Sequence, residues 1–114
     1  MLPWSFMNKF EVVLMLSPEL ATNNINSEID KFKGLITNNS GKFVNEEDWG
    51  LRDLSYNIKK FKKAFYRYFQ VETLGNSINV IKNDLNQSEN ILRYLFIKVD
   101  EHQELPTKLN YEKK

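Results

Sequence analysis

Cysteine is absent from this chain of 114 residues, and His102 is its single histidine. Without cysteine the chain can form no disulfide and offers no thiolate nucleophile. One imidazole leaves zinc without the ligand set that this metal takes in proteins. Nucleophilic catalysis needs a serine or cysteine beside a base, and His102 falls in a polar stretch where we expect an exposed side chain. The sequence therefore predicts no enzyme, no metal centre and no cofactor.

Glycine is also scarce, and its four copies are well separated, at positions 34, 41, 50 and 75. The chain thus lacks the glycine-rich loop that cradles phosphate groups. An acylphosphatase would carry such a loop, with an arginine, directly after its first strand, where this chain has Ser17-Pro18-Glu19-Leu20. No apolar run approaches the ~20 residues that span a bilayer. The sequence therefore indicates neither a phosphate-cleaving enzyme nor a membrane protein.

Neither sign of charge is in excess, since 16 lysines and arginines stand against 15 aspartates and glutamates, for a net charge of +1. The total argues neither for nor against nucleic acid, and only the distribution of charge can decide. Hydrophobic residues make up 41% of the chain, which suits one compact domain. We expect a short N-terminal extension at 1–7, one domain at 8–99 and a polar C-terminal tail at 100–114.

Apolar patterning predicts the order strand, helix, strand, strand, helix, strand. The strands are expected at 10–16, 42–58, 65–71 and 91–99, and the helices around the apolar stripes Ile25/Ile29/Phe32/Ile36 and Leu74/Ile78/Ile81/Leu85. Ser17-Pro18 is suited to start the first helix, Trp49-Gly50 indicates a bulge, and 59–63 is predicted to be a basic hairpin turn. This order is typical of the ferredoxin-like βαββαβ sandwich, an α+β fold with two helices on one face of a four-stranded antiparallel sheet.

The other face of this sheet has no helix to cover it, and strand alternation predicts which residues line it. We expect the helices to contact Val12, Leu14, Leu16, Phe69, Val71, Tyr94 and Phe96, and the open face to carry Glu11, Val13, Met15, Tyr66, Tyr68, Gln70, Arg93, Leu95 and Ile97. Exposed apolar surface of this kind usually marks a macromolecular interface. The residues predicted to bind a protein partner are Tyr66, Tyr68, Leu95 and Ile97.

Two of the predicted open-face residues, Tyr66 and Tyr68, have a second interpretation, because open-face aromatics stack on bases in RNA-recognition sheets. The third strand lacks the Arg/Lys-Gly-Phe motif of those modules, so packing against a protein is favoured. The hairpin lysines can attract phosphates in a salt-sensitive way or keep an exposed hairpin end soluble. These lysines are Lys59, Lys60, Lys62 and Lys63.

Arginine is a stronger candidate for contacting nucleic acid, because its planar fork fits phosphate and stacks on bases. Arg52 and Arg93 both fall within predicted strands. The structural alternative for these two side chains is an ion pair with Asp53, Glu11 or Glu72.

Several segments resemble the S-six family, the sixth protein of the bacterial small ribosomal subunit. The most specific is Glu47–Ile58, Glu-Asp-Trp-Gly-Leu-Arg-Asp-Leu-Ser-Tyr-Asn-Ile, which is similar to the family's Trp-Gly-x-Arg-x-Leu-Ala-Tyr-Pro-Ile. The run from Phe10 to Pro18 is similar to the family's opening Tyr-Glu-hydrophobic strand, and the likeness extends to about residue 98. The chain departs from the family pattern at Phe10, Ser55 and Asn57, where the family has Tyr, Ala and Pro.

The resemblance implies a structural constituent of the small ribosomal subunit that binds small-subunit ribosomal RNA in the platform region, together with the S-eighteen ribosomal protein. It implies no catalysis, no membrane and no small-molecule substrate, in a ribosome of the bacterial cytoplasm or of an organelle. Carried over to this chain, the RNA contacts are Lys9, Arg52 and Arg93, with the hairpin lysines secondary. The alternative is a free-standing ferredoxin-like regulatory or ligand-binding domain that dimerises through its open sheet face.

Overall fold

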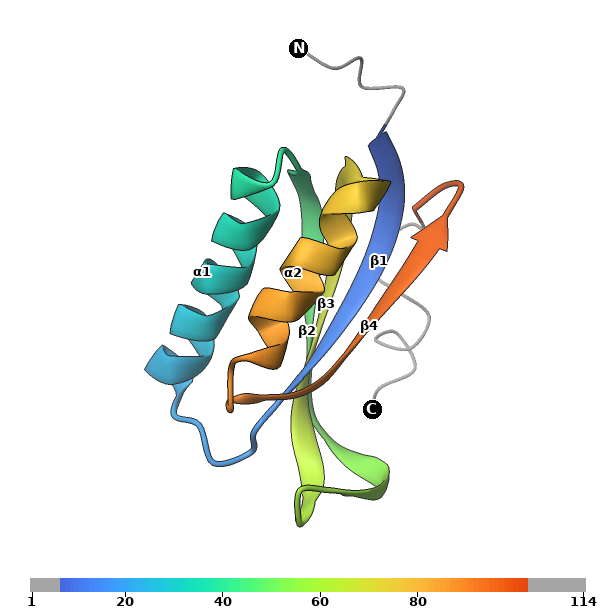
Figure 1. Ribbon diagram of the computed structural model, residues 1–114. Helices are drawn as coiled ribbons and strands as arrows, with labels where there is room; N and C mark the ends of the chain where they lie inside the picture. Colours follow the sequence, from blue (N-terminus) through green and yellow to red (C-terminus); the bar gives the residue numbers. More distant parts are fainter. Residues whose placement is uncertain (1–6, 103–114) are drawn as a thin grey trace.

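The computed structural model describes residues 7–102. Its elements are β1 (Met7–Leu16), α1 (Thr22–Asn38), β2 (Lys42–Ile58), β3 (Phe61–Leu74), the 3-10 turn η2 (Gly75–Ser77), α2 (Ile78–Asn86) and β4 (Ile91–Val99). Neighbouring strands are antiparallel in the order β2-β3-β1-β4, and both helices cover one face of the sheet (Figure 1). The predicted ferredoxin-like α+β fold is confirmed. Of the predicted terminal segments, 1–6 and 103–114 lie outside the described residues.

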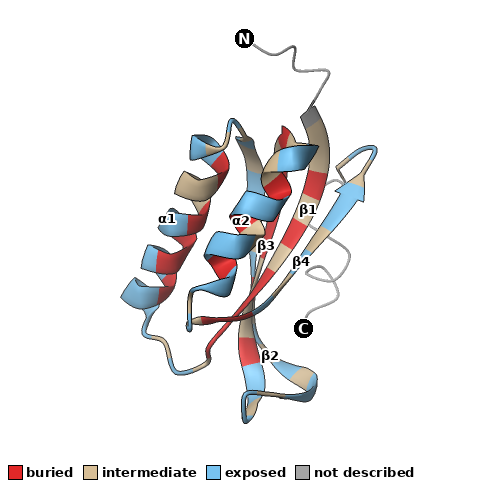
Figure 2. Cartoon of the chain, viewed as in Figure 1, coloured by how far each residue is buried: buried red, intermediate tan, exposed pale blue. Residues whose placement is uncertain are grey.

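The core lies between the sheet and the helices. Val12, Leu14 and Leu16 of β1 are completely buried, because β1 is paired on both sides and every second residue faces the helices. The apolar stripe of α1 packs onto this layer, where the rings of Phe32 and Phe69 have centroids 4.9 Å apart. Figure 2 shows the buried residues of both helices on the sides that face the sheet. The residues predicted to point inward are confirmed in this core.

Both helices begin later than their sequence signals predicted. The Ser17 hydroxyl accepts a hydrogen bond of 3.3 Å from the Glu19 amide, so it caps a turn that precedes α1, whose N-cap residue is Ala21. The assignment of Leu74 to the second helix is wrong, because this residue pairs with Met7 and ends β3. Strand pairing therefore takes precedence over the helical spacing that includes Leu74.

The turn of the β2–β3 hairpin is tighter than the predicted 59–63. Only Lys59 and Lys60 form it, with φ of 50° and 71°, while Phe61 already pairs with Ile58. Two consecutive residues with positive φ are the mark of a type I′ turn, whose twist matches that of the flanking strands. Lys62 and Lys63 accordingly belong to β3.

The bulge predicted in β2 is present, and it changes what lies on the open face. The β2–β3 register shifts between Asp48 and Gly50, and Gly50 has a φ of 77°, a conformation that glycine adopts without steric strain. At this bulge Trp49 stacks on Tyr68, with ring centroids 5.0 Å apart and planes inclined by 10°. Tyr68 is consequently 2% exposed, and the prediction that this side chain is open to a partner is wrong.

A second, smaller apolar cluster also covers part of the open face. Met15 of β1, Ala64 of β3 and Leu92 of β4 are buried there, with Leu54, Ile58 and Phe61 of the hairpin among the residues packed against them. Met15 lies on the predicted face but is buried rather than exposed. The hairpin end thus shields these apolar side chains from water on the face of the sheet that has no helix.

Gly34 and Gly41 allow a matched test of this packing. A Cβ on Gly34, inside α1, would meet nothing within 4 Å, so Gly34→Ala should raise the free energy of unfolding by about 1 kcal/mol through helix propensity. A Cβ on Gly41 would come within 2.7 Å of the Ile36 side chain and carbonyl oxygen, so Gly41→Ala should destabilise the fold. Urea unfolding of both variants checks this, and a destabilising Gly34→Ala would contradict the open space found at this position.

Candidate nucleic-acid and protein interface

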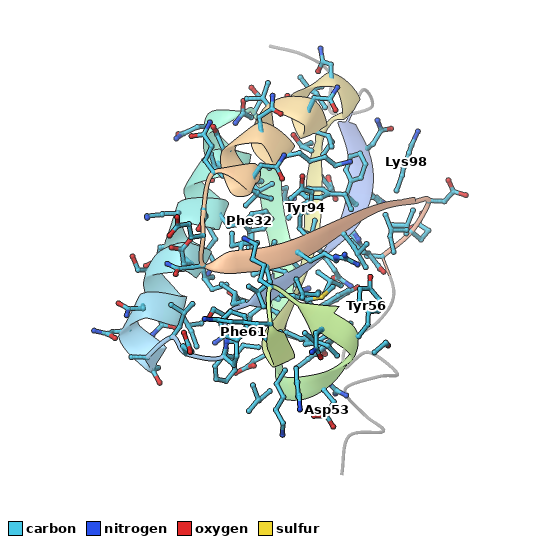
Figure 3. All side chains as sticks on the ribbon, turned by 60° about the horizontal axis from the view of Figure 1, so that its bottom comes forward. Phe32, Asp53, Tyr56, Phe61, Tyr94 and Lys98 are labelled. Atoms are coloured by element: carbon cyan, nitrogen blue, oxygen red, sulfur yellow. The ribbon has the colours of Figure 1, made fainter. Side chains whose placement is uncertain are left out.

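The end of the β2–β3 hairpin brings the two outer strands of the sheet into contact. The Arg93 guanidinium of β4 donates a hydrogen bond through Nη1 to the Tyr56 hydroxyl of β2, and its central carbon lies 5.2 Å from the centroid of the Tyr56 ring. Since β3 and β1 separate these strands in the sheet, the hairpin end must bend across the open face. Figure 3 shows Tyr56, Asp53 and Phe61 on this projecting hairpin.

The contact leaves Arg93 available to a ligand. Arg93 is exposed, as is Tyr56, and a guanidinium has five N–H donors, of which this contact uses one. Stacking against an aromatic ring restricts the orientation of the guanidinium plane. Tyr56 therefore holds Arg93 against the hairpin in a defined orientation.

Arg52 is positioned differently from Arg93. Its Nε donates a hydrogen bond of 3.1 Å to the Trp49 carbonyl oxygen, while its Nη2 is shielded from solvent and has no hydrogen-bond partner within residues 7–102. The expected alternative, an ion pair with Asp53, Glu11 or Glu72, is not formed by Arg52 among the described residues. This side chain is half-buried, so it can offer only part of its guanidinium to a ligand.

The lysines predicted to contact RNA fall into two separate groups. Lys59, Lys60, Lys62 and Lys63 are exposed on the hairpin, and Lys63 forms an exposed ion pair of 3.5 Å with Asp53. Lys9 pairs with Glu101 at 3.2 Å. It lies six residues along β1 from Met15, the residue that pairs with Arg93, which corresponds to about 20 Å of strand. The structure therefore brings Arg93 into contact with the hairpin that carries these four lysines, through Tyr56, and leaves Lys9 at the other end of the sheet.

The residues predicted to bind a protein partner form a strip beside the hairpin, apart from the buried Tyr68. Leu95 and Ile97 of β4 are 47% and 53% exposed. Tyr66 is half-buried and lines a small cavity of about 160 Å³, whose wall also includes Leu95 and Tyr56. Such a strip of exposed apolar side chains next to a hollow is suited to bind an apolar side chain of another protein.

Sequence reasoning did not assign a site role to Tyr56 or Trp49, although both stand in the segment from Glu47 to Ile58. The signal for Tyr56 was the alternation Leu54, Tyr56, Ile58, which places these three side chains on one side of β2, and all three line the 160 Å³ cavity. No comparable signal locates Trp49, because the bulge at Gly50 interrupts the alternation.

His102 is not the exposed side chain that the polar sequence around it indicated. Both ring nitrogens are shielded from solvent without a hydrogen-bond partner in residues 7–102. Burial is the main cause that lowers the pKa of His102 below its ordinary 6.5; the carboxylates of Glu11, Glu72 and Glu101 oppose this shift, and Lys9 reinforces it. The imidazole is therefore held neutral near pH 7.

Within the described part of the chain, no cluster of three or more His, Asp or Glu side chains could hold a metal ion. The helices described are too short or too polar to cross a bilayer. The basic hairpin and the apolar strip on the open sheet face thus define the class of this protein as a ferredoxin-like domain with a surface suited to binding macromolecules.

Comparison with known proteins identifies the family within this class. The family model of ribosomal protein S6 matches residues 9–98. Small ribosomal subunit protein bS6 of Christiangramia forsetii is 33% identical over 96 residues, which cover 84% of this chain and 86% of that protein. Its counterpart in Brucella canis is 33% identical over 95 residues, 83% of this chain and 64% of the longer Brucella protein.

Among solved structures, the crystal structure of 30S ribosomal protein S6 from Thermotoga maritima superposes with a TM-score of 0.77 and 20% identity, over 82% of this chain and 88% of that one. This likeness supports the fold. The chain belongs to the ribosomal protein S6 family. It is a structural, non-catalytic protein of the small ribosomal subunit, as the resemblance of Glu47–Ile58 implied.

The depressed pKa of His102 predicts the pH dependence of the segment that carries it. Between pH 6.5 and the lower folded-state pKa, the unfolded chain binds more protons than the folded chain. The contribution of the neutral His102 ring to the free energy of unfolding is therefore fully present above about pH 6.5, and it is lost as the pH falls through the folded-state pKa. Because His102 is the single histidine, an NMR titration of its ring protons reports this pKa without ambiguity. A measured value at or above 6.5 would contradict the shielding of the two ring nitrogens. Glu11→Gln, which removes an opposing charge, should lower the pKa further.

Proposed function

We propose that this protein binds small-subunit ribosomal RNA in the platform region and does so together with the S-eighteen ribosomal protein, in the ribosome of a bacterial cytoplasm. The proposal separates two surfaces. The basic hairpin with Arg93 contacts RNA, and the apolar strip of Tyr66, Leu95 and Ile97 contacts the protein partner.

The observation that carries the RNA part is the local charge of the hairpin. Four lysines and Arg93 lie there, and the neighbouring acid Asp53 is already paired with Lys63. Although the net charge of the whole chain is only +1, this end of the molecule is strongly positive. A concentrated positive patch attracts phosphates and releases their counterions, which makes binding salt-sensitive. Arg93 adds a fork that can hold a phosphate through two hydrogen bonds.

The protein part is supported by the exposure of Leu95 and Ile97. Two large apolar side chains on neighbouring outward positions of one strand are unfavourable in water, and burial against a partner removes this unfavourable contact. The sheet face beside them is already partly closed by the hairpin, so the free surface is a narrow strip. The same strip could also form a homodimer, and binding of the S-eighteen protein together with sedimentation of the free protein distinguishes the two.

Arg93→Ala should weaken binding to a platform RNA fragment, measured with the S-eighteen protein present, by about 10- to 100-fold, the loss expected for a charge-assisted hydrogen bond. It should also lower the slope of log K against log salt by about one. Arg93→Lys should recover only part of the loss because the planar fork is missing. Lys98→Ala is the matched control, since Lys98 is an exposed cation on the same strand, well away from the hairpin (Figure 3). If Lys98→Ala and Arg93→Ala lower the RNA affinity equally, the loss reflects net charge alone and contradicts a specific contact of Arg93.

Leu95→Glu should weaken binding to the S-eighteen protein by about 2 kcal/mol or more, as for a central interface residue. Val80→Glu is its control, because Val80 of α2 is exposed to a similar degree, 49%, on the helix side of the molecule. Isothermal titration calorimetry gives both affinities, and sedimentation gives the state of association of the free protein. A homodimer that Leu95→Glu dissociates, with no binding to the S-eighteen protein, would support the regulatory or ligand-binding alternative.

A further inference from the structure

A groove lies between α1 and α2, on the helix side of the molecule and away from the hairpin. Its volume is about 460 Å³, within the range of about 300–1,000 Å³ found for small-ligand pockets. Its apolar lining consists of Phe32 and Leu35 of α1, Leu85 of α2 and Ile91 of β4. The space is therefore large enough for one or two long side chains of another molecule.

One wall of this groove carries a buried carboxylate. Glu28 is 6% exposed, and its two oxygens accept hydrogen bonds of 3.1 Å from the Ser88 hydroxyl and 2.9 Å from the Asn90 amide. These bonds tie α1 to the segment that leads into β4 and fix the carboxylate in place. The cation nearest to it is Lys31, whose Nζ lies 3.8 Å away and whose side chain is 71% exposed. The carboxylate is thus held by hydrogen bonds, while its counter-ion is largely exposed to water and the ion pair is correspondingly weak.

The remaining charges leave the groove acidic. Asp84 of α2 lines its rim. The other lysines of the helices are directed elsewhere, since Lys33 pairs with Glu46 of β2 at 2.7 Å and Lys82 lies 5.6 Å above the Phe96 ring of β4. A phosphate backbone would be repelled by Glu28 and Asp84, whereas a cation would be attracted.

Gly34 opens the groove further. It lines the wall formed by α1, and a Cβ at this position would meet nothing within 4 Å. The fold of the chain itself therefore does not require a glycine here, although glycine is unfavourable inside a helix. The missing side chain leaves room for another chain to approach the helix backbone.

We propose that the groove between α1 and α2 binds a lysine or arginine side chain presented by a basic segment of another protein. The alkyl stem of that side chain packs on Phe32, Leu35 and Leu85, as long cationic side chains do on apolar surface. Its charged head lies between the Glu28 and Asp84 carboxylates, where it replaces the exposed Lys31 as the partner of Glu28. This site is separate from the hairpin and from the apolar strip on the opposite face of the sheet.

The test uses the full chain labelled with ¹⁵N and a short basic peptide, acetyl-Arg-Leu-Arg-amide, with acetyl-Glu-Leu-Glu-amide as the charge-reversed probe. The basic peptide should shift the amide signals of 28–35 and 84–88 in a saturable manner that weakens with salt. The acidic peptide should leave these signals in place. Absence of saturable shifts in the groove, shifts centred on another surface, or equal binding of the two peptides would overturn the proposal.

Two substitutions test the residues themselves and leave the buried Glu28 network intact. Asp84→Asn removes the rim charge, and Gly34→Leu fills the open wall with a residue that favours helix. Each should raise the Kd of the basic peptide at least fivefold. Asp30→Asn is the control, because Asp30 is an exposed acid of α1 that does not line the groove. If Asp84→Asn and Gly34→Leu leave the Kd unchanged while the spectra show a folded protein, the proposed site is wrong.

Discussion

The β2–β3 hairpin is longer than the strands beside it, and much of the structure depends on this difference in length. β3 has 14 residues and β1 has 10, and the last residue of β1, Leu16, pairs with Phe65. The four residues of β3 before Phe65 therefore have β2 as their single neighbour. A two-stranded ribbon is marginally stable by itself and twists strongly, so its apolar residues must be covered. The ribbon bends back over the sheet, which packs the partly buried Leu54, Ile58 and Phe61 against Met15, Ala64 and Leu92.

The same bend determines the surface available to partners. It brings Tyr56 to Arg93 and confines the exposed apolar side chains of β4 to a strip that includes Leu95 and Ile97. It also adds Arg93 to the hairpin that carries four exposed lysines, so that a chain with almost no net charge has a strongly basic end. On the helix side, the groove is lined by the acids Glu28 and Asp84 and by the exposed Lys31.

The regular part of this fold could be predicted from sequence because its periodicity is local. The alternation of Val12, Leu14 and Leu16 and the helical spacing of Ile25, Ile29, Phe32 and Ile36 each have one favourable arrangement, and both were confirmed. Boundaries were less predictable, since Leu74 fits a helical stripe equally well until its pairing with β1 is known.

Contacts between distant segments were harder to foresee. Nothing in the sequence around Tyr68 indicates that Trp49, 19 positions earlier, stacks on its ring, because the bulge at Gly50 sets that geometry. The pairing of Tyr56 with Arg93 likewise depends on how far the hairpin bends. Residue types thus predicted the kind of interface, while the availability of each side chain depended on tertiary structure.

The two lysines of the type I′ turn place positive charge at the hairpin end, and they do so in an unfavourable backbone conformation. Asparagine and glycine are the residues best suited to two consecutive positive φ angles, yet Lys59 and Lys60 occupy them at 50° and 71°. For residues with a Cβ this conformation costs about 1 kcal/mol or more each. An Asn-Gly turn would make the hairpin more stable but would remove two positive charges. The two turn positions can therefore favour either backbone stability or positive charge, and in this chain both hold lysine.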